Sequence, residues 1–164
     1  NTADTEDDQI TITAAVNYDC GFAKSYLGVH WFDNAKAVGS SSFGGDWGRM
    51  GNFKNDKGAP IHSGFGDANG WSVMLGVDIP VGNGKVKTTL GYLDASSDNK
   101  GSETADVDQD LKRFMVGAGY EYYLSKRTTV YMGAGYLQDS IDTAQGKSYD
   151  PSWVQVNCGL KHKF

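Results

Sequence analysis

Apolar side chains recur at every second position in several runs of the chain, and stretches without this order separate the runs. The clearest run extends from Trp71 to Ile79, where Trp, Val, Leu, Val and Ile alternate with Ser, Met, Gly and Asp. A period of two places alternate side chains on opposite faces of a β-strand. No run has the spacing of an amphipathic helix, so the pattern predicts an all-β chain.

The runs predict about seven strands, which are joined alternately by short turns and long polar stretches. The short turns are expected near Gly21, Gly82–Gly84 and Leu124–Arg127. This rhythm is typical of an antiparallel meander, here a single segment over residues 1–164. The expected strands cover residues 9–18, 22–32, 71–79, 85–92, 113–122, 130–136 and 153–164, and the expected loops cover residues 33–69, 94–110 and 138–151.

Composition decides which kinds of membrane segment are feasible. The 164 residues are 39% hydrophobic and carry a net charge of -5, and no run approaches the roughly 18 apolar residues of a membrane helix. A membrane strand needs only about 9–11 residues, of which every second one faces lipid. The long polar stretches, which are unusual in a compact soluble domain, suit the outer loops of a membrane barrel. The acidic balance argues against nucleic acid as a partner.

The placement of aromatic residues distinguishes a membrane barrel from a soluble β-sandwich. On the apolar face of the strands, rings lie near both ends, and mainly Val, Leu, Ala, Met and Ile lie between them. Rings at the two lipid–water boundaries are typical of a barrel, whereas a sandwich core would hold large rings in its middle. The predicted interface girdle is Tyr18, Tyr120, Tyr122 and Phe164 at the inner rim and Trp31, Trp71, Tyr92 and Tyr136 at the outer rim.

The opposite face carries charges, amides and many glycines, which suits a water-filled interior. A charge that faced lipid at mid-depth would cost about 2–4 kcal/mol, so these side chains are expected to face water. Lys85 and Lys87 share one side, and we interpret them as an anion-favouring patch rather than simple hydration of a wide lumen. The predicted pore-lining residues are Lys24, Asp78, Lys85, Lys87, Arg113, Glu121, Gln155 and Asn157.

Two motifs near the end of the sequence resemble a known family. Residues 116–120 (VGAGY) and 123–131 (YLSKRTTVY) resemble the penultimate hairpin of Gram-negative general diffusion porins, and 159–164 (GLKHKF) looks like their closing strand. The final aromatic is similar to the signal that the outer-membrane insertion machinery reads. The resemblance implies a 16-stranded, usually trimeric, water-filled channel for passive diffusion of small hydrophilic solutes and ions, in contact with lipid and lipopolysaccharide. It also implies a constriction loop that faces a ladder of basic wall residues.

The chain departs from this family in length and in strand parity. It has roughly half the length of a porin, and an odd number of strands places Asn1 on the outside, whereas a barrel of this type has even parity. An isolated seven-stranded sheet would also expose unpaired edges to lipid. We therefore expect the C-terminal half of a porin, paired with an N-terminal half; the constriction residues would lie in that half.

No pattern of catalytic or metal-binding residues is found in the sequence. Cys20 and Cys158 have no ligand spacing, and nothing groups Ser, His and Asp into a triad. We expect no enzyme activity, cofactor or metal. The acidic residues within 94–110 could attract cations that bridge lipopolysaccharide, or they are a solvated loop. The alternatives to a porin are a small closed eight-stranded structural or adhesion barrel without a pore and, more remotely, an outer-membrane hydrolase.

Overall fold

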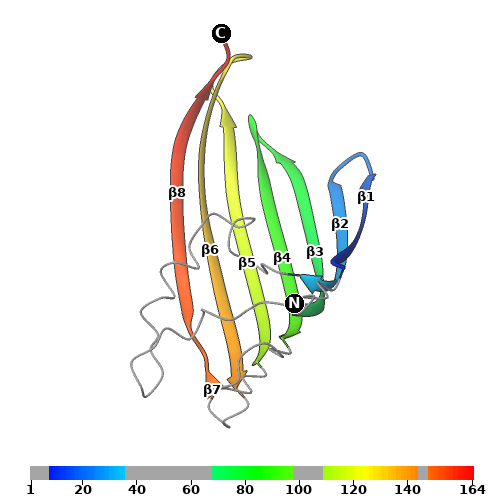
Figure 1. The fold of residues 1–164 in the computed structure, drawn as a ribbon. Helices are drawn as coiled ribbons and strands as arrows, with labels where there is room; N and C mark the ends of the chain where they lie inside the picture. Colours follow the sequence, from blue (N-terminus) through cyan, green and yellow to red (C-terminus); the bar gives the residue numbers. More distant parts are fainter. Residues whose placement is uncertain (1–7, 36–67, 98–108, 144–147) are drawn as a thin grey trace.

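The strands of the chain form one curved antiparallel sheet (Figure 1). The computed structural model describes residues 8–35, 68–97, 109–143 and 148–164. Consecutive strands pair in sequence order from β1 to β6, and β6 also pairs with both β7 and β8. The strands are β1 (Ile10–Asp19), β2 (Lys24–Ala35), β3 (Ala68–Val81), β4 (Gly84–Ser97), β5 (Gln109–Tyr123), β6 (Thr128–Thr143), β7 (Ser148–Tyr149) and β8 (Ser152–His162).

The predicted all-β meander with seven long strands is confirmed, but several strands are longer than expected. β2 continues to Ala35 and β3 begins at Ala68, so the expected 33–69 loop is shorter at both ends. The remaining residues of that loop lie outside the described ranges. β4 and β6 likewise extend into stretches that were expected to be loops, and the short β7 was not expected. Pairing continues there because backbone hydrogen bonds do not require an apolar convex face. In these extensions the buried side chains lie on the opposite face, as Ala95 and Ile141 show.

The register joins the apolar faces of the separate strands into one surface. Leu75 of β3 lies opposite both Leu27 of β2 and Leu90 of β4. Leu90 in turn lies opposite Val116 of β5, which pairs with Tyr136 of β6. A slip by one residue would move every side chain of a strand to the other face. The observed register therefore separates a continuous apolar face from a continuous polar one.

The Leu-Ser-Lys-Arg-Thr turn between β5 and β6 is stabilised by one hydroxyl group. The Oγ atom of Ser125 accepts hydrogen bonds from the backbone N–H groups of Arg127 at 3.1 Å and Thr128 at 3.0 Å. The backbones of Ser125 and Thr128 also bond to each other at 3.1 and 3.3 Å. This local use of a serine side chain closes the turn without glycine.

Two other short turns use glycine where the backbone turns left-handed. Gly82, the first residue of the Gly82–Asn83 turn between β3 and β4, has a φ of 59°, and Gly21 between β1 and β2 has a φ of 87°. Side chains are strained in this region, so glycine favours both reversals. All three short turns lie at one end of the sheet (Figure 1).

The two edges of the sheet, β1 and β8, run in the same direction. Each strand from β1 to β6 is antiparallel to the next, and β8 is antiparallel to β6. Within the described residues, β1 pairs only with β2 and β8 pairs only with β6. Each edge strand therefore presents one row of backbone groups without a partner strand.

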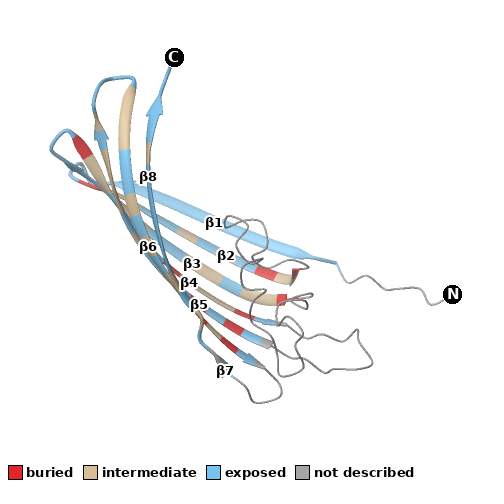
Figure 2. Ribbon diagram, turned by 90° about the vertical axis from the view of Figure 1, so that its left-hand side faces the viewer, coloured by how far each residue is buried: buried red, intermediate tan, exposed pale blue. Residues whose placement is uncertain are grey.

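The apolar face is exposed, as expected of a surface that meets lipid. Leu75 is 47% exposed and Val116 is 42% exposed, so neither lies in a protein core. Figure 2 shows long exposed stretches on the strands, and buried residues gather mainly toward one end of them. A protein rarely leaves so much apolar surface in contact with water, and such a surface is normally covered by a partner or a membrane. The face therefore fits contact with hydrocarbon.

We predict that Val116→Arg destabilises the protein much more than Met115→Arg. Val116 is on the apolar face between its aromatic positions, and the neighbouring Met115 points to the opposite face. The cost at Val116 should be about 2–4 kcal/mol, since the guanidinium would face hydrocarbon. Chemical unfolding after reconstitution into lipid vesicles measures both free energies. Equal costs for the two variants would contradict the assignment of faces.

Candidate pore wall

All eight residues that the sequence predicts to line a pore share one face of the sheet. In the register, Lys24 lies opposite Asp78 and Asp78 opposite Lys87, while Lys85 lies opposite Glu121. The face is concave, because one hollow of about 400 Å³ is lined by residues as far apart in the sheet as Asp78 of β3 and Asn157 of β8. The predicted residues on this face are Lys24, Asp78, Lys85, Lys87, Arg113, Glu121, Gln155 and Asn157.

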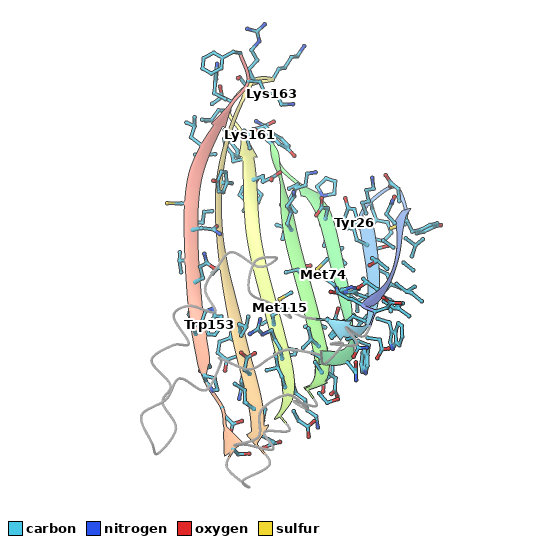
Figure 3. The ribbon with its side chains drawn as sticks, in the orientation of Figure 1. Tyr26, Met74, Met115, Trp153, Lys161 and Lys163 are labelled. Atoms are coloured by element: carbon cyan, nitrogen blue, oxygen red, sulfur yellow. The ribbon has the colours of Figure 1, made fainter. Side chains whose placement is uncertain are left out.

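Near the short turns, this concave face carries charges that are matched in pairs. The Nζ atom of Lys85 lies 3.4 Å from a carboxylate oxygen of Asp78, and that of Lys87 lies 3.2 Å from Glu121. Tyr26, labelled in Figure 3, donates its hydroxyl to Asp78 at 3.4 Å. These side chains are partly exposed, so each ion pair contributes at most about 1 kcal/mol. The two lysines therefore have carboxylate partners, which the sequence interpretation of an anion-favouring patch did not foresee.

At mid-height, the concave face of β5 and β6 is lined by glycines. Gly117 lies opposite Gly135, and Gly119 lies opposite Gly133, on the neighbouring strands β5 and β6. The hollow of about 400 Å³ lies over these four glycines, with Asn157 among the other residues that line it. Because hydrogen atoms replace side chains here, the wall is thin and the space in front of it is open.

The end of the concave face remote from the short turns holds a buried ion pair. The guanidinium of Arg113 donates from Nε at 2.6 Å and from Nη2 at 2.7 Å to the two carboxylate oxygens of Asp139. Arg113 is 8% exposed and Asp139 is 0% exposed, and the Trp153 ring lies 5.8 Å from the guanidinium carbon. Such a bidentate salt bridge has short, directional hydrogen bonds. Arg113 is thus on the predicted face but is buried, and so differs from the exposed lysines.

Sequence reasoning missed Asp139 and the role of Trp153. Asp139 falls in the stretch 138–151, which lacked an apolar alternation and was expected to be a loop. A signal for this part of the strand was present on the concave face, where Leu137, Asp139 and Ile141 occupy successive inward positions of β6. An acidic residue at an inward position beside a basic one on the previous hairpin strand would have indicated the pair.

Apolar residues also lie on the concave face at this end, where a polar wall was expected. Phe32, Ala35, Ala68 and Ala95 form a buried cluster with Leu93 packed against it. Leu111 of β5 is fully buried, and it lies opposite both Ala95 and Ile141. The concave face therefore changes along the strands from charged, through glycine-lined, to buried and apolar.

The residues of the predicted interface girdle lie on the convex face. Trp31 is directly opposite Trp71, whose ring is 5.6 Å from that of Tyr92, toward the end away from the short turns. Tyr120 and Tyr122 lie toward the short turns, with ring centroids 6.4 Å apart. Tyr18 and Tyr136 are placed at the matching ends of this face, and Phe164 lies just beyond β8 with its ring 5.0 Å from that of His162.

Comparison with known proteins decides the family. A family model described as Gram-negative porin matches residues 1–142. The chain belongs to the Gram-negative porin family. The match includes the Val116–Tyr131 motif and ends before the motif at 159–164. No curated protein and no solved structure matches the chain.

Membership in the family places this porin in the bacterial outer membrane. Gram-negative porins are channel proteins rather than enzymes. The described residues include no helix that is long and apolar enough to cross a membrane. Among the same residues, no three His, Cys, Asp or Glu side chains are grouped to hold a metal ion. Cys20 and Cys158 are both free thiols.

We predict that Asp139→Ala destabilises the porin strongly, whereas the double variant R113M/D139L destabilises it less. Removal of the carboxylate from a buried ion pair costs about 3–5 kcal/mol, while apolar replacement of both partners is often nearly neutral. Urea unfolding followed by tryptophan fluorescence gives both values. The opposite order of the two variants would show that the pair does not stabilise this end of the sheet.

Proposed function

We propose that this porin forms a water-filled channel through which small hydrophilic solutes and ions diffuse passively. The observation that carries the proposal is the contrast between the two faces of the sheet. The convex face is apolar and exposed, with rings toward both ends, and the concave face carries ionised groups and a hollow. A sheet of this kind separates lipid from water when it is closed into a barrel.

The proposed selectivity is modest in the part of the channel near the ion pairs. Lys85 and Lys87 each lie beside a carboxylate, so this part of the wall presents alternating charges of both signs. A wall with closely paired opposite charges attracts neither anions nor cations strongly, because the fields of the pairs largely cancel within a Debye length. Small polar solutes of either sign should pass this level.

We propose that further strands of the same porin close the barrel and that three barrels associate, as the family resemblance implies. Unpaired backbone groups at β1 and β8 cannot face lipid without a large cost. Since the two edges run in the same direction, an odd number of added strands closes the barrel with antiparallel pairs throughout. An N-terminal half of a porin could supply them. A small closed barrel made of these strands alone would need a parallel seam, which disfavours the alternative of a pore-free eight-stranded barrel.

Planar bilayer recording tests the channel itself. Purified porin should insert in steps, and each step should add a large current that grows linearly with salt concentration. Steps that close in groups of three at high voltage would support three barrels. Correctly folded protein that leaves the bilayer silent would overturn the proposed channel.

We also predict that Gly135→Trp lowers the single-channel conductance, whereas Ala134→Trp leaves it unchanged. A Cβ atom at Gly135 meets only ordinary contacts, the nearest at 3.6 Å to the carbonyl oxygen of Val116, so the variant should fold. The indole would project into the water-filled space and reduce the conductance by roughly 10–30%. Ala134 is the next residue along β6 and points to the convex face, so it is a matched control. If the two variants had equal conductance, the space in front of Gly135 would not be part of the conducting path.

The assembly is tested by electrophoresis without prior heating. A trimer should migrate at about three times the mass of the heated chain, because porin barrels resist detergent until they are heated. Chemical cross-linking of the purified porin in lipid provides an independent count. A single band at the mass of one chain in both experiments would contradict the trimer.

A further inference from the structure

We infer that the channel rectifies, because the described strands carry opposite net charge at their two ends. This inference deepens the proposed channel function and rests on it. The end with the three short turns faces the periplasm in barrels of this type, and the other end faces outward. The charged side chains of the described residues divide unequally between these ends.

At the periplasmic end, four cationic side chains of the described residues are left after the side-chain carboxylates there have been matched. Asp78 and Glu121 bind Lys85 and Lys87, and Asp19 lies opposite Lys24 in the register. The four remaining cations are exposed, and among the described residues no carboxylate side chain lies within ion-pair distance of them. They belong to the β5–β6 turn and the end of β8, and they are Lys126, Arg127, Lys161 and Lys163.

These four cations lie close together at the mouth. The backbone N–H of Lys163 bonds to the carbonyl of Arg127 at 2.9 Å, and Lys161 lies opposite Thr129. Figure 3 places Lys161 and Lys163 at the tip of β8 beside the β5–β6 turn. Lys161 is on the concave face, so its charge acts on the opening of the lumen itself. This mouth should concentrate anions.

At the outer end the described residues are mostly acidic. Arg113 and Asp139 neutralise each other, and Lys112 is the other described cation at this end. The remaining carboxylates lie at or just beyond the outer ends of the strands, and most of them are exposed. They are Asp8, Asp33, Asp94, Asp110, Asp142 and Asp150. In the register, Asp33, Asp94, Asp110 and Asp142 lie on the convex side of the rim, and Asp94 lies opposite Lys112. Their charge therefore acts from the rim and not from the lumen wall, and at about 0.1 M salt, where the Debye length is about 10 Å, this mouth should concentrate cations.

An opposite charge at each mouth makes current depend on the sign of the voltage. When the outer side is positive, cations enter through the acidic mouth and anions enter through the basic mouth, so both ions accumulate in the lumen. When the voltage is reversed, each ion must enter through a mouth of its own sign, and the lumen is depleted. The current should therefore be larger with the outer side positive.

Current–voltage curves of single porin assemblies at 0.1 M and 1 M KCl test the inference. At about 0.1 M the current ratio at opposite voltages should be roughly 1.5–3, and it should fall toward one at about 1 M, where the Debye length is only about 3 Å. Orientation is read by attaching a large polyethylene glycol maleimide, too big to pass the channel, to Cys20 from one side in a C158S background. Cys20 is an exposed thiol in the β1–β2 turn, so labelling identifies the periplasmic side.

Two sets of variants separate the charge effect from a structural one. The quadruple variant K126Q/R127Q/K161Q/K163Q should reduce the ratio toward one at 0.1 M KCl. The matched control Lys112→Gln removes a cation from the acidic end and should leave the ratio unchanged or raise it. All variants are refolded in detergent, and their heat-dependent electrophoretic mobility verifies the barrel.

The results that would overturn rectification differ from the result that would contradict the proposed channel. A symmetric curve at 0.1 M KCl with normal conductance would overturn rectification and leave the channel intact. A larger current with the outer side negative would overturn the proposed sign. An unchanged ratio in the quadruple variant would overturn the assignment to these four cations. Absence of any conductance would instead contradict the proposed function.

Discussion

Backbone hydrogen bonding in a medium without water is the constraint on which this structure depends. Each strand must pair with its neighbours, because lipid offers no alternative partner for an N–H or C=O group. Pairing leaves only the side chains free to distinguish the two sides of the sheet. The alternation of the sequence uses this freedom, and the register from β1 to β8 aligns it without a slip, apart from one irregularity between Phe32 and Ala35.

The same constraint explains why charge can be placed so differently along the concave face. Water that fills a barrel hydrates exposed lysines and carboxylates at little cost, and Lys85 and Lys87 remain partly exposed beside their partners. Arg113 and Asp139 are shielded from water, and two hydrogen bonds between their side chains, in bidentate geometry, replace hydration. A buried pair of this kind requires excellent geometry to offset the loss of hydration. The two types of ion pair thus reflect two local environments on one face.

The glycines of β5 and β6 show how the absence of side chains shapes this wall. Gly117 opposite Gly135 leaves space on the concave side, while Val116 and Tyr136 on the same strands remain exposed on the convex side. A soluble sheet would gain stability from side chains at these positions, because cross-strand contacts stabilise sheets. In the proposed channel, this open space would be available to water and solutes instead.

Period-two alternation by itself determined most of the strands and the two faces of the sheet, and short motifs near the end of the sequence indicated the family. Alternation is a local property, so it can be read from residues such as Val73, Leu75 and Val77 without knowledge of their partners. The Leu-Ser-Lys-Arg-Thr motif was similarly local, since Ser125 bonds within its own turn.

Partnerships and burial were decided only by the tertiary structure. Asp139 is 26 residues from Arg113, and the two side chains meet only because β5 and β6 pair in a register that continues beyond the apolar alternation. The extension of β4 and β6 beyond the apolar pattern, and the buried cluster around Phe32, were equally hidden. These features depend on which strands lie side by side and on what covers a face, and alternation along a single strand carries neither.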